Sequence, residues 1–272
     1  MIVSVILGGL GNQLFQYAAA RYQAKRLGCD LYIEKRLYLL PKYKIHPFAL
    51  HNFQIDIKCT SLMQYINLFG FNIFREKNMA FDPNINFTKN NTILVGYWHS
   101  EKYFEPIRNE LVQEIKGNYI FDNKVSESLC QEMRREESVS IHVRRSDYLS
   151  KKNSSFFESI SLNYYYNALE LIKAQYPSIK IFVFSDDNQW VMDNFKTDVP
   201  TIFVTHNDVS HGYDDMILMS NCKHNITANS TFSWWGAWLN ENPSKFVFTP
   251  AKWVKGQNYL EPDLIPESWI KL

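Results

Sequence analysis

Residues 2–28 of the chain are IVSVILGGLGNQLFQYAAARYQAKRLG. The β-branched run at 2–6 predicts a strand, the glycines that follow it predict a turn, and the remaining residues predict a helix to about Leu27. A strand, a glycine turn and a helix together form the unit with which α/β proteins hold a phosphate at a helix N-terminus. The stretch therefore predicts an α/β fold.

The same alternation of strands and helices returns along the chain. Further strands are predicted for LYIE (31–34), TILVGYW (92–98), VSIHV (139–143), IKIFVFS (179–185), TIFV (201–204), HNITAN (224–229) and KFVFTP (245–250), with helical stretches between most of them. Regular alternation with short connections indicates parallel sheets covered on both faces. We expect two Rossmann-like domains, 1–135 and 136–272, with ligands beyond the carboxyl ends of their strands.

The composition excludes several classes of protein. The chain has 272 residues, is 46% hydrophobic and 15% aromatic, and carries a formal net charge of +1. This apolar content predicts a substantial core, and the scattered basic residues argue against a nucleic-acid partner. The four cysteines, Cys29, Cys59, Cys130 and Cys222, have no metal-type spacing and suit reduced thiols in the cytoplasm.

Membrane contact is expected to be peripheral at most. The N-terminus is unlike a signal peptide, and no run approaches the ~18 apolar residues of a membrane span. The stretch SLMQYINLFGFNIFREK (61–77) is apolar with basic residues at its end. It suits either a helix resting on a membrane surface or, more simply, a core helix.

The opening motif suits either a dinucleotide-binding turn or a turn whose amides bind another ligand. Gly9 and Gly11 match two glycines of the dinucleotide fingerprint, and Glu34 stands where that fingerprint places an acid for the ribose. Leu14 replaces the third glycine, and Asn12 and Gln13 put two amides at the helix start. These amides suit hydrogen bonds to hydroxyl groups or to a phosphate.

A second constellation is IHVRRSDY (141–148). Because side chains alternate along a strand, His142 and Arg144 share one face. Arg144 offers a planar, permanently charged fork that suits a diphosphate, and Arg145 is expected to anchor Asp147 or a neighbouring loop. The alternative is a surface cluster of salt bridges.

Two further stretches place polar residues after strands. In FVFSDDNQW (182–190), Asp186 and Asp187 suit a Mn²⁺ site, a helix N-cap, or a contact to a guanine or ribose. In HNITANSTFSWWGAWLN (224–240), Ser230 and Thr231 begin a helix whose free N–H groups suit an anion. Its tryptophans suit core packing better than a platform for a sugar.

Together these stretches resemble the bacterial α-1,2-fucosyltransferases of the family that also holds the blood-group H enzymes, glycosyltransferase family 11. The resemblance rests on GGLGNQLFQYA, HVRRSDY, FSDD with Trp190, and LMSNCKHNITANSTFSWWGAWLN, which occur in the family's order over nearly the whole chain. It implies a GT-B-like architecture of two Rossmann-like domains facing a central cleft. The first is the acceptor side and the second binds GDP-fucose.

The resemblance also implies a reaction and its residues. Fucose passes from GDP-β-L-fucose to the 2-hydroxyl of a terminal β-galactoside with inversion and without a required metal, on a surface oligosaccharide that can be lipid-linked. Arg144 holds the phosphates, Asn12 faces the fucose, and Asp147 is a candidate base or an orienter of the arginines. The implied donor-binding set is His142, Arg144, Ser185, Asp186, Asn229, Ser230, Thr231, Ser233, Gly11 and Gln13.

Two other functions stay open at this point. Gly9, Gly11 and Glu34 suit an NAD-dependent oxidoreductase, and the many aromatic residues suit a carbohydrate-binding protein without catalysis. Binding of GDP in the presence of EDTA would distinguish a fucosyltransferase from both the oxidoreductase and the carbohydrate-binding protein.

Overall fold

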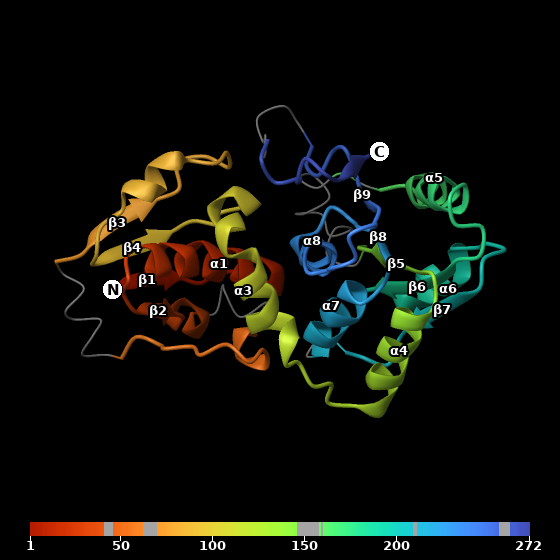
Figure 1. Ribbon diagram of the computed structural model, residues 1–272, viewed down its shortest axis with the longest axis horizontal. Helices are drawn as coiled ribbons and strands as arrows, with labels where there is room; N and C mark the ends of the chain where they lie inside the picture. The colour runs from red at the N-terminus through yellow and green to blue at the C-terminus, as the bar shows by residue number, and fades with distance from the viewer. Residues whose placement is uncertain (41–45, 62–69, 146–157, 159, 209–210, 256–261) are drawn as a thin grey trace. The chain divides into compact units, whose positions relative to one another are not determined.

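The structure, a computed structural model, describes residues 1–272 except 41–45, 62–69, 146–157, 159, 209–210 and 256–261. The chain divides into two compact units, each with its own sheet (Figure 1). Unit 1 comprises Met1–Tyr119 and Leu260–Pro266, and unit 2 comprises Ile120–Tyr259 and Glu267–Leu272. Every strand pairing among the described residues is parallel, as the alternation predicts.

Unit 1 is built on a four-stranded sheet in the order β2-β1-β4-β3. Its elements are β1 (Ile2–Val5), α1 (Leu10–Arg26), β2 (Leu31–Glu34), β3 (Asn72–Arg75), β4 (Thr92–Val95) and α3 (Arg108–Val112), with short 3-10 helices at Arg36–Leu39, Leu50–Asn52, Pro83–Phe87, Glu101–Tyr103 and Glu105–Ile107 and a π-helical turn at Gln113–Gly117. Strand β1 lies between β2 and β4, so Ile2 pairs with both Leu31 and Thr92.

Helix α1 is buried along most of its length because it carries small and apolar residues on several faces. Leu14, Phe15, Ala18 and Ala19 are fully buried, and α1 packs on β1. Burial of this apolar area is the main source of the stability of a helix in a protein.

The end of the stretch 61–77 differs from its prediction as part of a core or membrane-surface helix. Residues 62–69 lie outside the described part, but Asn72–Arg75 form strand β3 and pair with β4. A short apolar run does not distinguish a strand from a helix by its pattern alone. Here pairing with a neighbouring strand decides the conformation.

The chain returns to unit 1 near its C-terminal end. Asp263 accepts a hydrogen bond from the backbone N–H of Phe81 at 2.9 Å and forms an ion pair with Lys102. These contacts hold a segment from the end of the sequence on residues from its first half.

Unit 2 has a six-stranded sheet in the order β10-β9-β8-β5-β6-β7. Its elements are α4 (Lys124–Arg135), β5 (Ser138–Val143), α5 (Leu162–Lys173), β6 (Lys180–Ser185), α6 (Asn188–Asn194), β7 (Thr201–Val204), α7 (Gly212–Ser220), β8 (His224–Ile226), α8 (Thr231–Trp238), β9 (Val247–Thr249) and β10 (Ile270–Lys271). Numbered from β5 along the chain, this is the 3-2-1-4-5-6 order of dinucleotide-binding sheets.

Alternate residues of β5 and β6 face two different cores. Val139, Ile141 and Val143 pack with residues of α5 and α6. Phe182 and Phe184 pack with residues of α4 and α7 on the other face. Strand β6 (KIFVFS) is almost continuously apolar, which is typical of a parallel strand covered on both faces, whereas β5 (SVSIHV) turns serines and His142 to its second face.

Helix α4 differs from the sequence prediction, which gave no helix there and placed the domain boundary at 135/136. The structure divides the chain between Tyr119 and Ile120, so α4 belongs to unit 2. Its buried residues Cys130 and Met133 pack with Phe182, Phe184 and residues of α7. Helix α4 lies beside α7 (Figure 1).

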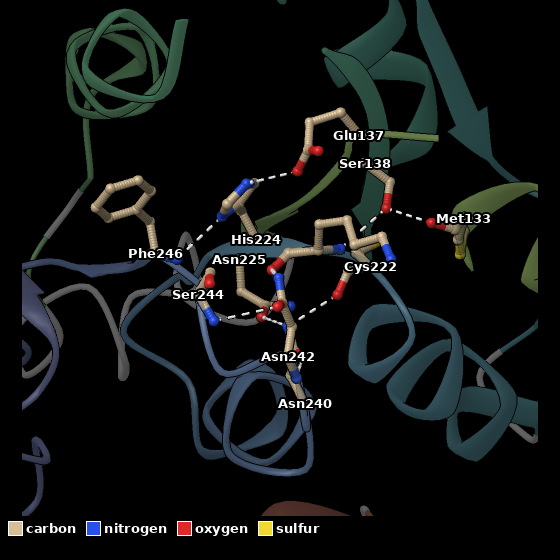
Figure 2. A network of polar contacts seen from close by, with 11 residues as sticks. Met133, Glu137, Ser138, Cys222, His224, Asn225, Asn240, Asn242, Ser244 and Phe246 are labelled. Carbon is tan, nitrogen blue, oxygen red and sulfur yellow. Dashed lines mark hydrogen bonds and ion pairs between the residues drawn. The ribbon is translucent and has the colours of Figure 1, made fainter. Parts of the chain in front are cut away.

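Part of the long C-terminal motif forms a network of buried polar contacts at the amino ends of β5 and β8 (Figure 2). The backbone N–H of Phe246 donates to Nδ1 of His224 at 3.0 Å, so the proton of the ring stands on Nε2, 2.9 Å from Glu137. Asn240 Nδ2 donates to the carbonyl of Cys222 and to Asn225 Oδ1. This half of the motif is structural.

None of the described helices is long and apolar enough to cross a membrane.

Candidate active site

The strand order of unit 2 reverses between β5 and β8, and in unit 1 the two central strands are β1 and β4. Ligands of open α/β sheets bind beyond the carboxyl ends of the strands at such points. Arg144 follows β5 there, and Ser230 with Thr231 follows β8, while Asn12 follows β1.

Asp186 connects the two arginines after β5. Its Oδ2 lies 3.3 Å from Nε of Arg144, and its Oδ1 accepts the backbone N–H of Arg145 at 2.8 Å. Because the carboxylate takes the Nε side of the Arg144 guanidinium, that group is held in one orientation. A planar guanidinium held in this way suits bidentate binding of a phosphate.

The neighbouring residues fix the loop after β6 to the loop after β5. Ser185 Oγ donates to the carbonyl of Val143 at 2.9 Å and accepts the N–H of Asp187 at 3.0 Å. Asp187 caps α6 by accepting the N–H of Trp190 and pairs with Arg145 at 3.4 Å. The Arg145 guanidinium also lies 3.5 Å from the centre of the Trp190 ring. Thus Arg145 is anchored to α6, and its predicted partner Asp147 lies outside the described residues.

His142 is buried on the same edge, next to the first turn of α8. Its ring centre lies 5.4 Å from that of Phe232. Burial, with a smaller contribution from the charge of Arg144, lowers the pKa of His142 to about 3, so the ring is neutral. Among the described residues nothing hydrogen-bonds its buried Nδ1. An unsatisfied buried polar atom costs about 1–3 kcal/mol, which a ligand that hydrogen-bonds it would recover.

Helix α8 begins at the same edge. Ser230 caps it by accepting the N–H of Phe232 at 3.3 Å, and Thr231 is half-buried beside it. A hydroxyl that accepts a hydrogen bond keeps its own proton to donate, so Ser230 can still contact an anion. The positive end of the helix dipole favours an anion at this position.

Several predicted donor-binding residues make hydrogen bonds to the backbone of unit 2, and their contact with a donor stays a prediction. Ser233 Oγ accepts the N–H of Ala228 and donates to the carbonyl of Ser230, which fixes the turn before α8. Asn229 Nδ2 donates to the backbone carbonyls of Glu158 and Trp253. These hydrogen bonds fix the backbone between β8 and α8.

Gln13 has a similar structural position in unit 1, and Gly11 is buried in α1 beside it. The Gln13 amide donates to the carbonyls of Gly8 and Pro47 and accepts the N–H of Ala49 at 2.8 Å. Gln13 is fully buried and holds the chain around Pro47 against the glycine turn.

Asn12 lies beyond the central strands β1 and β4 of the first sheet, beside a residue that sequence reasoning missed. Its Oδ1 lies 3.1 Å from Nε2 of His99, which follows β4. The two residues are 87 positions apart, and no sequence pattern links them. The parallel pairing of β1 with β4 could have indicated that the segments after both strands meet.

Glu34 does not stand ready for a ribose. Arg36 donates to its carboxylate from the backbone and the side chain, and Thr60 donates at 2.7 Å. Although burial raises the pKa of Glu34, these hydrogen bonds hold it below its usual value. The feature that favoured an NAD site therefore belongs to an internal ion pair.

The carboxylates after β6 are likewise engaged with cations, since Asp186 pairs with Arg144 and Asp187 with Arg145. Within the described part of the chain, no three His, Cys, Asp or Glu side chains gather as metal ligands would.

Comparison with known proteins identifies the class. The family model for glycosyl transferase family 11 matches residues 2–270. The chain belongs to this family, which confirms the family expected from the four motifs, and it is a glycosyltransferase.

Individual relatives agree with this assignment. The chain is 30% identical to the O-antigen biosynthesis glycosyltransferase WbnK of Escherichia coli, over 99% of each chain. It is 29% identical to an alpha-1,2-colitosyltransferase of Escherichia coli over 100% of this chain and 99% of the relative. It is 25% identical to galactoside alpha-(1,2)-fucosyltransferase 2 of Pongo pygmaeus, over 86% of this chain and 67% of that protein.

Solved structures share the fold. The fucosyltransferase NodZ from Bradyrhizobium matches with a TM-score of 0.53 at 18% identity, over 86% of this chain and 91% of that chain. NodZ alpha-1,6-fucosyltransferase soaked with GDP-fucose matches with a TM-score of 0.51 at 17% identity, over 88% and 91%. The likeness confirms the predicted GT-B-like α/β fold class.

Proposed function

We propose that the enzyme transfers L-fucose from GDP-β-L-fucose to the 2-hydroxyl of a terminal galactose, with inversion at the anomeric carbon. The observation that carries the proposal is the β5–β8 edge of unit 2, where Arg144, neutral His142 and the start of α8 follow or end two neighbouring strands. Membership in family 11 and the activities of the relatives support the choice of sugar and linkage.

The roles at this edge follow from charge. When the bond between the anomeric carbon and the phosphate oxygen breaks, positive charge develops on the sugar and negative charge on the departing GDP. The Arg144 guanidinium and the N-terminus of α8 can stabilise this leaving group. The hydroxyl groups of Ser230 and Thr231 donate hydrogen bonds to phosphate, and Nδ1 of His142 forms a hydrogen bond with the nucleoside.

The galactose 2-hydroxyl oxygen forms the new bond from the opposite face and loses its proton. We propose Asn12 as the residue of unit 1 that hydrogen-bonds the transferred sugar. Asp147 stays a candidate for the base or for orienting the arginines.

We further propose that a metal is not required, because the Arg144 guanidinium and the N-terminus of α8 can balance the charge of the phosphates, and the nearby carboxylates are paired with arginines. The acceptor we propose is a β-galactoside of an O-antigen-type oligosaccharide, lipid-linked or free, met in the cytoplasm with at most peripheral membrane contact. The similarity to the O-antigen biosynthesis glycosyltransferase WbnK supports this acceptor class.

The first test is thermal unfolding of the purified protein with GDP, GDP-fucose, GDP-colitose, GDP-mannose or NAD, each in EDTA and in Mn²⁺. A ligand that binds only the folded state raises the melting temperature. We expect GDP and GDP-fucose to do so in EDTA, and fucose to appear on the 2-hydroxyl of a galactoside in a transfer assay.

Other outcomes would redirect the proposal. A preference for GDP-colitose would change the donor and keep the site, and stabilisation only with Mn²⁺ would return Asp186 and Asp187 to a metal. Stabilisation by NAD alone, or binding of galactosides without any nucleotide, would reject the proposal that the β5–β8 edge of unit 2 binds GDP-fucose.

A further inference from the structure

The segment after β4 holds a bulky residue in a strained conformation. Trp98 has φ = 60°, in the left-handed region that β-carbon sterics disfavour, and its side chain is fully buried. Its ring packs against those of Phe74 and Tyr103 at centre distances of 5.9 and 5.4 Å. Strain of this kind persists only where the surroundings enforce it, and it gathers at functional sites.

Glu76 enforces this conformation. Its two carboxylate oxygens accept the backbone N–H groups of Tyr97, at 2.7 Å, and Trp98, at 3.0 Å. Gly96 has no room for a side chain, since a β-carbon there would lie 2.5 Å from Cβ of Glu76. The turn is therefore fixed by a partly buried network of hydrogen bonds rather than by the preference of its own residues.

The strained turn places the His99 ring next to the Asn12 side chain. The His99 ring lies between Phe15, at 5.1 Å and edge-on, and Tyr97, at 5.2 Å and stacked. With the ring clamped on both sides, Nε2 lies 3.1 Å from Asn12 Oδ1. An acceptor oxygen at that distance selects the tautomer with the proton on Nε2.

The other end of the Asn12 amide is fixed as well. A β-carbon on Gly8 would lie 2.7 Å from Asn12 Nδ2, so the NH₂ group lies directly over this glycine. Gly8 has φ = 80°, and the hydroxyl of Tyr38 donates to its carbonyl at 2.7 Å. His99 and Gly8 together decide which way the amide points.

From this arrangement we propose that His99 is a positioning residue for Asn12. By donating from Nε2, His99 fixes the Asn12 amide with Oδ1 toward the His99 ring and the NH₂ group on the opposite side. From that side the NH₂ group donates to an oxygen of the transferred sugar. Glu76 and Trp98 place His99 for this task. The inference rests on the proposed function for the sugar contact, but the orientation of the amide is independent of it.

A double-mutant cycle tests the proposal. H99F keeps a ring between Phe15 and Tyr97 but has no donor, H99Q keeps a side-chain N–H, and N12A removes the amide. We expect H99F to lower kcat for transfer about tenfold or more with KM for GDP-fucose within about twofold, and H99Q to recover part of the loss.

The decisive variant is N12A/H99F. If His99 acts through Asn12, the double variant is no slower than N12A, because the group that His99 orients is gone. Multiplying losses, or equal losses in H99F and H99Q, would overturn the proposal in favour of an independent or merely packing role.

A second measurement does not depend on turnover or on folding of the variants. Long-range ¹H–¹⁵N NMR of the wild-type protein reports the tautomer of His99, and a proton on Nδ1 with bare Nε2 would overturn the proposal. If the wild type transfers no fucose while His99 carries its proton on Nε2, the proposed function fails and the amide geometry stands.

Discussion

The Nε atom of Arg144 lies 3.3 Å from Oδ2 of Asp186, while Oδ1 of the same carboxylate accepts the backbone N–H of Arg145. One acidic side chain therefore sets both the direction of the guanidinium and the course of the backbone that carries it.

The first prediction concerns this pair. D186N leaves an oxygen to accept the N–H of Arg145 but removes the charge that holds Arg144. We expect kcat/KM for the donor to fall about tenfold to a hundredfold, since a charge-assisted hydrogen bond contributes about 1.5–3 kcal/mol. R144A should abolish transfer with unchanged thermal unfolding in the absence of ligand.

The matched control is D193N, on the exposed side of α6, where Asp193 accepts only from Gln189 among the contacts described. It should leave kcat/KM unchanged. Full activity of R144A would exclude the phosphate-binding role.

The second prediction concerns pH. The pKa of His142 is about 3 in the folded protein and about 6.5 when unfolded, so below pH 6.5 the unfolded state binds more protons. The contribution to stability is present above pH 6.5 and is lost as the pH falls toward 3, by about 2 kcal/mol between pH 6.5 and 4.5.

Urea unfolding of the wild type and H142N over this range measures the effect. Because other histidines titrate in both proteins, the difference between the two curves carries the information. Parallel curves would show that His142 is not buried as a neutral ring.

The third prediction uses two glycines. Gly8 and Gly28 both have φ in the left-handed region, at 80° and 60°, but a β-carbon meets Asn12 only at Gly8 and nothing within 4 Å at Gly28. Both alanine variants should lose about 1–2 kcal/mol of stability from the backbone conformation.

Only G8A should also lose transfer activity, because its β-carbon displaces the Asn12 amide. Comparing kcat of G8A and G28A at equal folded fraction separates the two effects. Equal activities would show that the position of Asn12 does not matter for transfer.

The fourth prediction concerns the polar network at the amino ends of β5 and β8. H224F leaves the buried N–H of Phe246 without its acceptor, so the free energy of unfolding should fall by about 1–3 kcal/mol. E137Q keeps an oxygen for His224 Nε2–H and should cost less.

Neither variant should change the Kd for GDP measured below the unfolding transition. The network lies at the amino ends of β5 and β8 (Figure 2), whereas Arg144 follows the carboxyl end of β5. A weakened Kd would mean that the two edges of the sheet are coupled.

The sequence predicted the sheets well because parallel strands are short, apolar and regularly spaced. It failed for α4, since KVSESLCQEMRR has a mainly polar composition and buries only Ser126, Cys130 and Met133. It failed for β3 because pairing with β4, rather than the local pattern, makes that segment a strand.

The residues at the unit 2 edge were predictable because each follows an apolar strand directly, as Arg144 and Asp186 do. His99 was not, because its role depends on a contact 87 positions away and on a strained Trp98 that no propensity suggests. Ser233, Asn229 and Gln13 have the residue types of ligand-binding groups, but their partners are backbone atoms of their own unit.

The return of the chain to unit 1 limits how this enzyme can be recombined. A fragment ending at Tyr119 lacks Asp263, so the N–H of Phe81 and the ammonium group of Lys102 lose their partner. A chimera that exchanges unit 1 with that of a relative must therefore graft two discontinuous pieces, Met1–Tyr119 and Leu260–Pro266, rather than one. A single crossover would combine Met1–Tyr119 of one parent with Leu260–Pro266 of the other, so the contacts of Asp263 would join segments from two different proteins.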